Sequence, residues 1–284
     1  MSAPEVTTRP MEETGRTKDE RRAGRWASVL IMFTLVAGVL SFVWSAKSYW
    51  LLPLASIQGA SIDELFNIIL VLTAIAFVAV HLFIGIALWR FPARQGTKAA
   101  HWHEHLGAEL TWTVVPAIGI IILGIAGEVV WAKVYSAPPA NAQQVDVVGR
   151  QFEWQFRYPG PDGKFGRSAP KFVTSGNPFG MDPSDPENKQ NVVTINDLHL
   201  VVNRPVLLHI TAIDVIHSLS LPNFRMKQDA VPGRVVDIWF TPDKPGAYQI
   251  VCAQLCGVGH YTMRGNITVQ SQGAFDQWLQ SQIK

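Results

Sequence analysis

The sequence is poor in cysteine, with only Cys252 and Cys256 in a chain of 284 residues. Two cysteines cannot build the disulfide framework of a small secreted domain. The motif C-x-x-C-H is absent, which excludes a covalently attached c-type haem in this chain. Charge is also scarce and nearly balanced, with a formal net charge of +2 at pH 7, so the overall charge does not predict a nucleic-acid partner.

Charge is missing altogether from a long stretch near the N-terminus. Residues 26–44 hold no charged side chain, and two later runs in the first half are almost as apolar. A run of about 20 apolar residues matches the thickness of a bilayer core, and core helices of soluble proteins are seldom so long and so apolar. Trp and Tyr stand at the ends of the runs, as at a membrane interface. We therefore predict three transmembrane helices, over residues 26–45, 63–91 and 109–135.

Basic residues indicate the orientation of these helices. The first 25 residues and the connector 90–108 carry several Arg and Lys residues, whereas the connector 46–62 has only Lys47. Because basic segments stay in the cytoplasm, residues 1–25 are predicted to be a disordered cytoplasmic tail and the chain beyond about residue 136 to lie outside. The first apolar run could also be a cleaved secretory signal. Its length favours a retained anchor.

Beyond Pro139 the chain changes to short segments rich in β-branched residues, separated by turns that contain Gly, Pro and Asn. This pattern predicts an all-β Greek-key sandwich or barrel over residues 143–271. Residues 159–190 interrupt it and are predicted to form a long surface loop. Apolar residues at helical spacing predict a C-terminal helix over 272–284. The expected strands are 144–148, 152–156, 192–195, 206–210, 235–240, 248–251 and 266–269.

The segment from Cys252 to Met263 contains both cysteines, then His260 four residues after Cys256, then Met263. Thiolate, imidazole and thioether are the ligands that soft copper prefers. A disulfide would leave the His and Met unexplained, and a structural zinc site has no need of a methionine. A mononuclear blue-copper site uses a single thiolate. Two thiolates with two histidines and a methionine fit a dinuclear copper centre better.

A dinuclear centre needs a second histidine from another part of the fold. His217, in D-V-I-H-S, follows a predicted strand and is the leading candidate, because a loop there could reach the cysteine segment. His209 lies within an apolar strand and is expected to be packed or surface-facing. His199 follows an Asn-Asp turn and is expected to be solvated.

Several motifs together resemble subunit II of haem–copper cytochrome c oxidase. The match begins with E-L-T-W-T-V-V-P from Glu109 and G-R-Q-F-E-W from Gly149. It continues through His217, the segment K-Q-D-A-V-P-G-R at 227–234, and C-x-Q-x-C-x3-H-x2-M from Cys252. The motifs occur in the family's order, and the resemblance covers about residues 63–284.

The resemblance implies a CuA centre of two copper ions in a cupredoxin-like domain, on the periplasmic side of a bacterial inner membrane. The centre would accept electrons from cytochrome c, or from a cytochrome c domain of another complex. It would pass them to haem in subunit I, which reduces O2 to water with proton translocation. Subunit I and the other oxidase subunits are the implied partners, with Asp229 and Arg234 facing subunit I. The implied copper ligands are His217, Cys252, the backbone carbonyl of Gln254, Cys256, His260 and Met263.

The sequence departs from the family pattern at two positions. Gln254 stands where the family usually has a Glu whose side chain helps to bind Mg2+, and an amide is a weaker ligand for that hard cation. We therefore expect an ordinary copper centre and a weakened, altered or absent magnesium site. Phe152 replaces the Trp through which electrons enter in the family. Phe152 and Trp154 would share one face of a strand, and they form the electron-entry candidates together with Tyr261.

A carboxylate lies at the cytoplasmic end of the last predicted span. The sequence alone slightly favours a plain interfacial residue at Glu109, whereas the family places a proton-entry group at this position. The neighbouring cluster of His101, His103, Glu104 and His105 could collect protons or bind a metal, and a solvated loop is its default interpretation.

Other functions share some of these features. A membrane nitric oxide reductase with a CuA-bearing subunit would have the same ligands and anchor. A membrane-anchored copper carrier is a different class, and carriers favour exposed sites of low coordination. Quinol oxidase subunit II has the fold without the copper ligands, so their presence argues against it. Consumption of O2 or of NO by the complex separates the first two functions.

Overall fold

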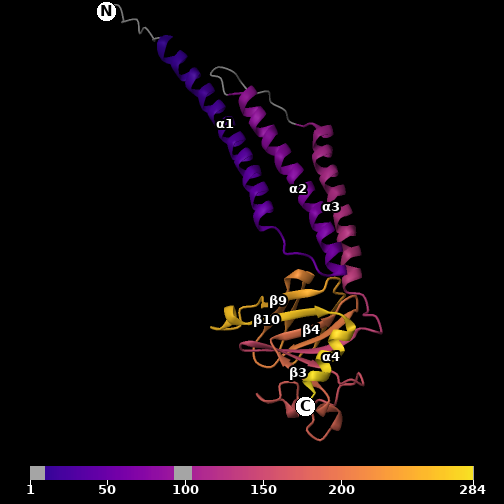
Figure 1. The fold of residues 1–284 in the computed structure, drawn as a ribbon. Coiled ribbons are helices and arrows are strands. Elements are labelled where there is room, and N and C mark those ends of the chain that lie inside the picture. Colours follow the sequence, from indigo (N-terminus) through magenta and orange to yellow (C-terminus); the bar gives the residue numbers. More distant parts are fainter. Residues whose placement is uncertain (1–9, 93–103, 284) are drawn as a thin grey trace, which may run out of the picture. The chain divides into compact units, whose positions relative to one another are not determined.

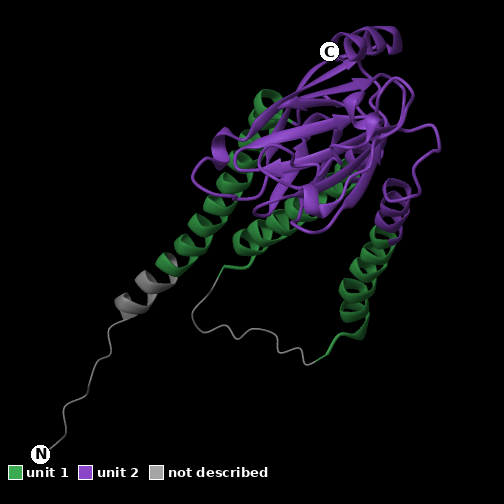
Figure 2. Cartoon of the chain, turned by 90° about the horizontal axis from the view of Figure 1, so that it is seen from below, with its two compact units in different colours: residues 1–50, 66–124 green, residues 51–65, 125–284 purple. Residues whose placement is uncertain are grey.

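The computed structural model describes residues 10–92 and 104–283 and contains two compact units. One unit comprises residues 1–50 and 66–124, and the other comprises residues 51–65 and 125–284 (Figure 2). The first unit holds most of the helical membrane segments. The second holds the β domain together with the ends of two helices.

Three long helices form the N-terminal part of the chain: α1 (Pro10–Tyr49), α2 (Ile57–Arg90) and α3 (Leu106–Val134), as Figure 1 shows. Each is long and apolar enough to cross a membrane. In their apolar windows only 11%, 6% and 0% of the residues are buried. The apolar side chains therefore face outward, as expected of helices surrounded by lipid or by another subunit.

Helices α1 and α2 begin earlier than the sequence predicted. Residues 10–25 are helical rather than irregular, because Glu, Lys and Arg in this segment favour a helix and Pro10 is suited to its first turn. Helix α2 begins at Ile57 because Ser56 caps it, accepting a hydrogen bond from Gly59 N at 3.0 Å on its hydroxyl. These N-terminal extensions are polar, so hydropathy alone misses them.

Helices α1 and α2 pack against each other around Ser28 and Gly85. The buried Ser28 donates its hydroxyl hydrogen to the carbonyl of Gly85 at 2.7 Å. One turn away, the guanidinium of Arg25 lies 5.4 Å from the centre of the Trp89 ring. A small residue at position 85 allows this approach, because a Cβ there would lie 2.8 Å from the sulfur of Met32.

The β domain is a sandwich of two five-stranded sheets, in the orders β3-β2-β1-β5-β8 and β4-β10-β9-β6-β7. Most neighbouring strands are antiparallel, whereas β1 with β5 and β4 with β10 are parallel. The strands are β1 (Gln143–Arg150), β2 (Glu153–Tyr158), β3 (Val192–Ile195), β4 (Asp197–Val201), β5 (Val206–Ala212), β6 (His217–Leu221), β7 (Met226–Ala230), β8 (Val236–Phe240), β9 (Gly246–Cys252) and β10 (Arg264–Gln270).

The facing sides of the two sheets form the hydrophobic core. Trp154 and Phe156 from one sheet, and Leu219 and Ile250 from the other, are completely buried. The two cysteines and Met263 belong to this same buried cluster. The ligand-bearing segment is therefore part of the domain's core and not an appendage on its surface.

The predicted all-β class is confirmed, and three strands were missed: β4, β6 and β7. Each is only five residues long. The sequences H-S-L-S-L and M-K-Q-D-A contain polar residues that weaken the strand signal. His217 consequently opens strand β6 instead of lying in a loop.

The insertion 159–190 contains two short 3-10 helices, η1 (Pro170–Phe172) and η2 (Pro186–Lys189), and is otherwise irregular. It is attached to the sheet through Arg157 of β2. That buried guanidinium pairs with Asp146 and donates to the hydroxyl of Ser168 at 2.8 Å. The insertion is therefore a packed loop whose attachment is polar.

The C-terminal helix α4 (Gln272–Gln282) packs on the core of the sandwich through the buried Phe275 and Leu279. Ser271 caps it by accepting from Ala274 N at 3.3 Å. Its Trp278 ring stacks on His199 with ring centres 3.8 Å apart. The expectation that His199 is solvated is therefore wrong, because a helix distant in sequence buries it.

Candidate copper centre

The loop between β9 and β10 carries four of the predicted ligands. Cys252 ends β9, and its N–H donates to the carbonyl of Met263 at 3.1 Å, which closes the loop. Within it, His260–Thr262 forms a 3-10 turn, η4. The sulfurs of Cys252 and Cys256 are 3.9 Å apart, and both cysteines are free.

Cys256 lies at the centre of this loop. Its sulfur is 3.6 Å from Nδ1 of His260 and 3.8 Å from the sulfur of Met263. The thiol of Cys252 donates to the carbonyl oxygen of Gln254 at 3.2 Å. The side chain of Gln254 is exposed, whereas its carbonyl points to the sulfurs. All the loop's predicted ligand atoms are thus gathered around two thiols.

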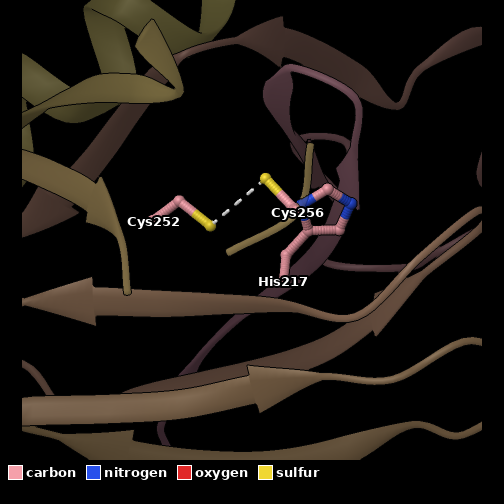
Figure 3. Close-up of side chains that lie close together, drawn as sticks. All are labelled: His217, Cys252 and Cys256. Atoms are coloured by element: carbon pink, nitrogen blue, oxygen red, sulfur yellow. Dashed lines mark hydrogen bonds between the residues drawn. The ribbon is translucent and has the colours of Figure 1, made fainter. Parts of the chain in front are cut away.

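His217 joins this group from the start of strand β6, which neighbours β9 in the same sheet. Figure 3 shows it beside the two cysteines, and one ligand atom from each of the three lies within 4.8 Å of the others. His217 is completely buried. It is placed there because β6 is hydrogen-bonded to β9, with Leu219 opposite Cys252.

The two nitrogens of His217 have different surroundings. Nε2 is 2.8 Å from Oδ1 of Asp214, whereas Nδ1 is buried without a hydrogen-bond partner. The acceptor carboxylate places the ring hydrogen on Nε2, which leaves a lone pair on Nδ1. A buried acceptor with no partner costs free energy unless something binds it. A metal ion held with the thiols meets that need, so the residues fit a metal.

Asp214 is held in place by three donors. Its carboxylate accepts from the N–H of Gln151 and from the N–H of Val215, both at 2.7 Å, as well as from His217. Burial raises the pKa of Asp214, but these hydrogen bonds outweigh it and leave the pKa below its ordinary value. The group therefore stays charged and fixes the orientation of the ring.

Gln151 connects Asp214 to the loop that carries the cysteines. Besides its N–H bond to Asp214, its side chain donates to the carbonyl of Cys256 at 2.6 Å. Neither Asp214 nor Gln151 was assigned a role from the sequence. The spacing of Asp214, three residues before a ligand histidine, is a signal that could have identified the carboxylate.

Burial keeps the thiol of Cys256 neutral at physiological pH. Burial and the neighbouring Cys252 raise the pKa of the Cys256 thiol to about 11. Metals bind thiolates, so a bound cation has to replace both thiol hydrogens. Two adjacent buried thiolates would otherwise repel each other without compensation.

The other candidate histidines do not reach this site. His209 has Nδ1 2.7 Å from Asp237 and Nε2 2.7 Å from Gln144, so both ring nitrogens are engaged. His199 is likewise engaged on both sides, by Asp197 at 3.0 Å and Gln270 at 3.2 Å. Of the three histidines considered, the structure brings His217 alone to the cysteines.

The electron-entry candidates occupy three different surroundings. Phe152 lies in the two-residue turn between β1 and β2, so it does not share a strand face with Trp154, and that prediction is wrong. Its ring packs on the cysteine loop, where a Cβ at Gly259 would lie 2.5 Å from it. Trp154 is completely buried, 6.0 Å from the ring centre of His217. Tyr261 is 75% exposed.

The remaining predicted residues lie elsewhere. Glu109 accepts a hydrogen bond from His105 N at 3.0 Å and so caps the start of α3. His101 and His103 of the neighbouring cluster lie outside the described residues. Ser218, the residue after His217, donates its hydroxyl hydrogen to the carboxylate of Asp229 at 2.7 Å. Arg234 is exposed.

Comparisons with known proteins identify the family of this chain. Residues 143–271 match the family described as the cytochrome c oxidase subunit II periplasmic domain, and residues 44–127 match its transmembrane domain. An alternative cytochrome c oxidase subunit 2 from Bradyrhizobium diazoefficiens is 34% identical over 90% of this chain and 91% of the relative. The chain belongs to the cytochrome c oxidase subunit II family.

Further members of the subunit II family are similar over most of their length. A cytochrome c oxidase subunit 2 from Cereibacter sphaeroides is 30% identical over 80% of this chain and 78% of the relative. Among solved structures, the periplasmic domain of subunit II of cytochrome oxidase from Bradyrhizobium japonicum is 29% identical. It covers 51% of this chain and 96% of its own, with a TM-score of 0.39. Members of this family are parts of a terminal oxidase, and copper is implied by membership.

Proposed function

We propose that the β domain holds a dinuclear CuA centre that receives electrons from a cytochrome c, or from a cytochrome c domain of another complex. The electrons would then pass to haem in the catalytic subunit of a terminal oxidase, where O2 is reduced to water with proton translocation. Membership of the family supports the role of electron-entry subunit. The donor, the copper number and the coupling to protons are the proposed parts.

The observation that carries this proposal is the unpartnered Nδ1 of His217 beside two buried thiols. His260 and Met263 complete the set from the cysteine loop, with the carbonyl of Gln254 as a further oxygen ligand. The two thiolates, two imidazoles and one thioether would supply enough soft ligands to hold two copper ions. Such a centre, when bound, supplies one-electron transfer.

The chain's own residues would keep the ligands from moving during electron transfer. Ligands come from strand ends and a closed loop, and Asp214 fixes the ring of His217. Burial of Cys252, Cys256 and Met263 excludes water from the sulfurs. A rigid and dry set of ligands keeps the reorganisation on gaining an electron small.

The same burial separates this function from that of a copper carrier. Carriers must release metal to a partner, which requires exposed ligands, whereas His217 and Met263 are 0% and 1% exposed. The comparisons likewise name cytochrome c oxidases and do not favour a nitric oxide reductase. We therefore retain the oxidase function.

Several features of the surroundings are part of the proposal. Basic residues support a cytoplasmic N-terminus and a periplasmic β domain. The contact between Ser28 and Gly85 supports retention of α1 as a membrane helix.

The neutral side chain of Gln254 supports a weak or absent Mg2+ site. We propose Glu109 as a proton-entry group in addition to its capping role.

The test is the visible and electron paramagnetic resonance spectrum of the purified oxidase complex, with metal analysis of the same sample. We expect two copper ions assigned to this chain and an unpaired electron shared between them. A signal from a single copper nucleus, or a complex without copper in this chain, would refute the dinuclear centre. Consumption of NO instead of O2 would refute the oxidase function.

A further inference from the structure

A glutamine at the tip of the β1–β2 hairpin reaches into the cysteine loop, residues 252–263. Gln151 forms the two-residue turn between these strands together with Phe152. Its side-chain amide donates to the carbonyl oxygen of Cys256 at 2.6 Å. Gln151 is not one of the proposed ligands, so this contact acts on the loop and not on a metal.

The cysteine loop is shaped to receive this side chain. Gly257 has a φ of +134°, a conformation that side chains other than glycine rarely adopt. A Cβ at this position would lie 2.8 Å from Nε2 of Gln151 and 3.1 Å from the ring of Phe152. Glycine therefore permits both the turn of the chain after Cys256 and the close approach of the hairpin tip.

Two carbonyl groups of the cysteine loop have different partners. The carbonyl of Cys256 accepts from the amide of Gln151, whereas the carbonyl of Gln254 accepts from the thiol of Cys252 at 3.2 Å. A bound metal replaces the thiol hydrogens. The carbonyl of Gln254 would then be released to act as a ligand, while that of Cys256 stays occupied by an amide hydrogen.

The backbone of Gln151 acts on the other ligand segment. Its N–H donates to the carboxylate of Asp214 at 2.7 Å, and Asp214 holds Nε2 of His217 at 2.8 Å. One residue thus acts on His217 through its main chain and on Cys256 through its side chain. The two contacts are separable, because a substitution of the side chain leaves the N–H in place.

We propose that Gln151 is a positioning residue of the copper centre, whose side chain fixes the peptide of Cys256 so that the carbonyl of Gln254 is the one presented to the metal. This inference deepens the proposed function and rests on it. Hydrogen bonds that support ligand groups set both the affinity and the electronic properties of a metal site. Loss of this donor should therefore leave copper bound, but less firmly and in altered surroundings.

The test compares Gln151→Leu with the unmodified protein in the purified oxidase complex. Leucine keeps bulk at this position and keeps the backbone N–H, but it cannot donate from its side chain. We expect the copper affinity, measured by competition with a chelator, to fall about tenfold or more. The copper hyperfine splitting in the electron paramagnetic resonance spectrum should change as well.

Two results would overturn the proposal. One is an unchanged affinity together with an unchanged spectrum. The other is a weaker affinity with an unchanged spectrum, because Gln151 would then stabilise the loop without positioning the oxygen ligand. If Gln151→Leu does not assemble, Gln151→Asn takes its place, since its amide is one methylene short of the Cys256 carbonyl. The same two changes are expected, and their absence would overturn the proposal.

Gln155→Leu is the matched control. Gln155 belongs to β2 of the same hairpin, and its side chain donates to Glu153 at 2.6 Å instead of to the cysteine loop. This variant should leave the copper affinity and the spectrum unchanged. The same changes in Gln155→Leu as in Gln151→Leu would mean a general disturbance of the hairpin, and the proposal would be overturned.

A measurement without copper separates this inference from the proposed function. Hydrogen–deuterium exchange of the copper-free full chain in detergent follows the backbone N–H groups of residues 253–262. In Gln151→Leu they should exchange about fivefold faster, because the loop loses a hydrogen bond to the hairpin. If the unmodified complex holds no copper, the proposed function itself has failed. If it holds two copper ions and exchange in Gln151→Leu is unchanged, the positioning inference alone has failed.

Discussion

The helical unit and the β domain use the same kinds of side chain in opposite ways. Ile, Val, Leu and Phe cover the outside of α2 and α3, and in the β domain they fill the core. Outward apolar residues on a long helix indicate lipid or another subunit. In the β domain, the two most exposed aliphatic side chains among the described residues, Val258 and Leu255, lie in the loop between β9 and β10, where exposed apolar groups indicate a contact with a partner protein. The meaning of an exposed Val thus depends on which element carries it.

The largest effect is expected when a proposed copper ligand is removed from the β domain. His217→Gln should abolish the copper spectrum and lower electron transfer more than about hundredfold, because loss of a ligand exceeds the effect of its supporting partners. Metal analysis of the complex gives the measurement. His209→Gln is the control, since both nitrogens of His209 are engaged elsewhere. Copper retained in His217→Gln would show that the second histidine is wrongly chosen.

The next largest effect concerns the core behind the site. Trp154→Ala should lower the free energy of unfolding by about 3–5 kcal/mol, because the completely buried ring leaves a cavity. Trp154→Phe should cost much less, since the indole N–H has no partner to lose. Thermal unfolding of the full chain in detergent measures both. Equal losses in the two variants would mean that the indole nitrogen makes a bond in the folded protein.

The membrane unit supplies the contrast to that core. Ile121→Ala on α3 removes a side chain that is 61% exposed. The same measurement should show a change well below that of Trp154→Ala. A large loss for Ile121→Ala would place this side chain in a tight contact within the chain.

Sequence patterns predicted the parts of this molecule that depend on local spacing. The three apolar runs and most strands follow from hydropathy and alternation. The cysteine loop follows from the order of four residues, and the structure brings His217, Cys252 and Cys256 together. That these residues bind copper stays a prediction.

Features that depend on distant contacts could not be predicted in this way. His199 is buried only because Trp278 of the C-terminal helix stacks on it. Phe152 lies outside the strand because it forms, with Gln151, the two-residue turn between β1 and β2. The short strand β6 is stabilised by its pairing with β7 and β9, which its own polar sequence does not reveal.

A smaller effect is expected at the carboxylate that orients His217. Asp214→Asn keeps an acceptor but loses the charge that holds the ring N–H, and we expect the copper affinity to fall about 10- to 100-fold. Competition with a copper chelator measures it. Asp237→Asn, beside His209, is the matched control and should leave the affinity unchanged. An unchanged affinity in Asp214→Asn would show that the surrounding strands orient His217 by packing alone.

The smallest effect lies in the helical unit, where a hydrogen bond from Ser28 joins α1 to α2. Ser28→Ala removes the hydrogen bond to the carbonyl of Gly85, and we expect a loss of about 0.6 kcal/mol in the stability of the helix pair. Thr34→Ala is the control, since its hydroxyl donates within its own helix, to Ile31 at 2.9 Å. Thermal unfolding in detergent compares the two variants. Equal effects would mean that α1 does not depend on this contact, and a retained α1 would then need support from another subunit.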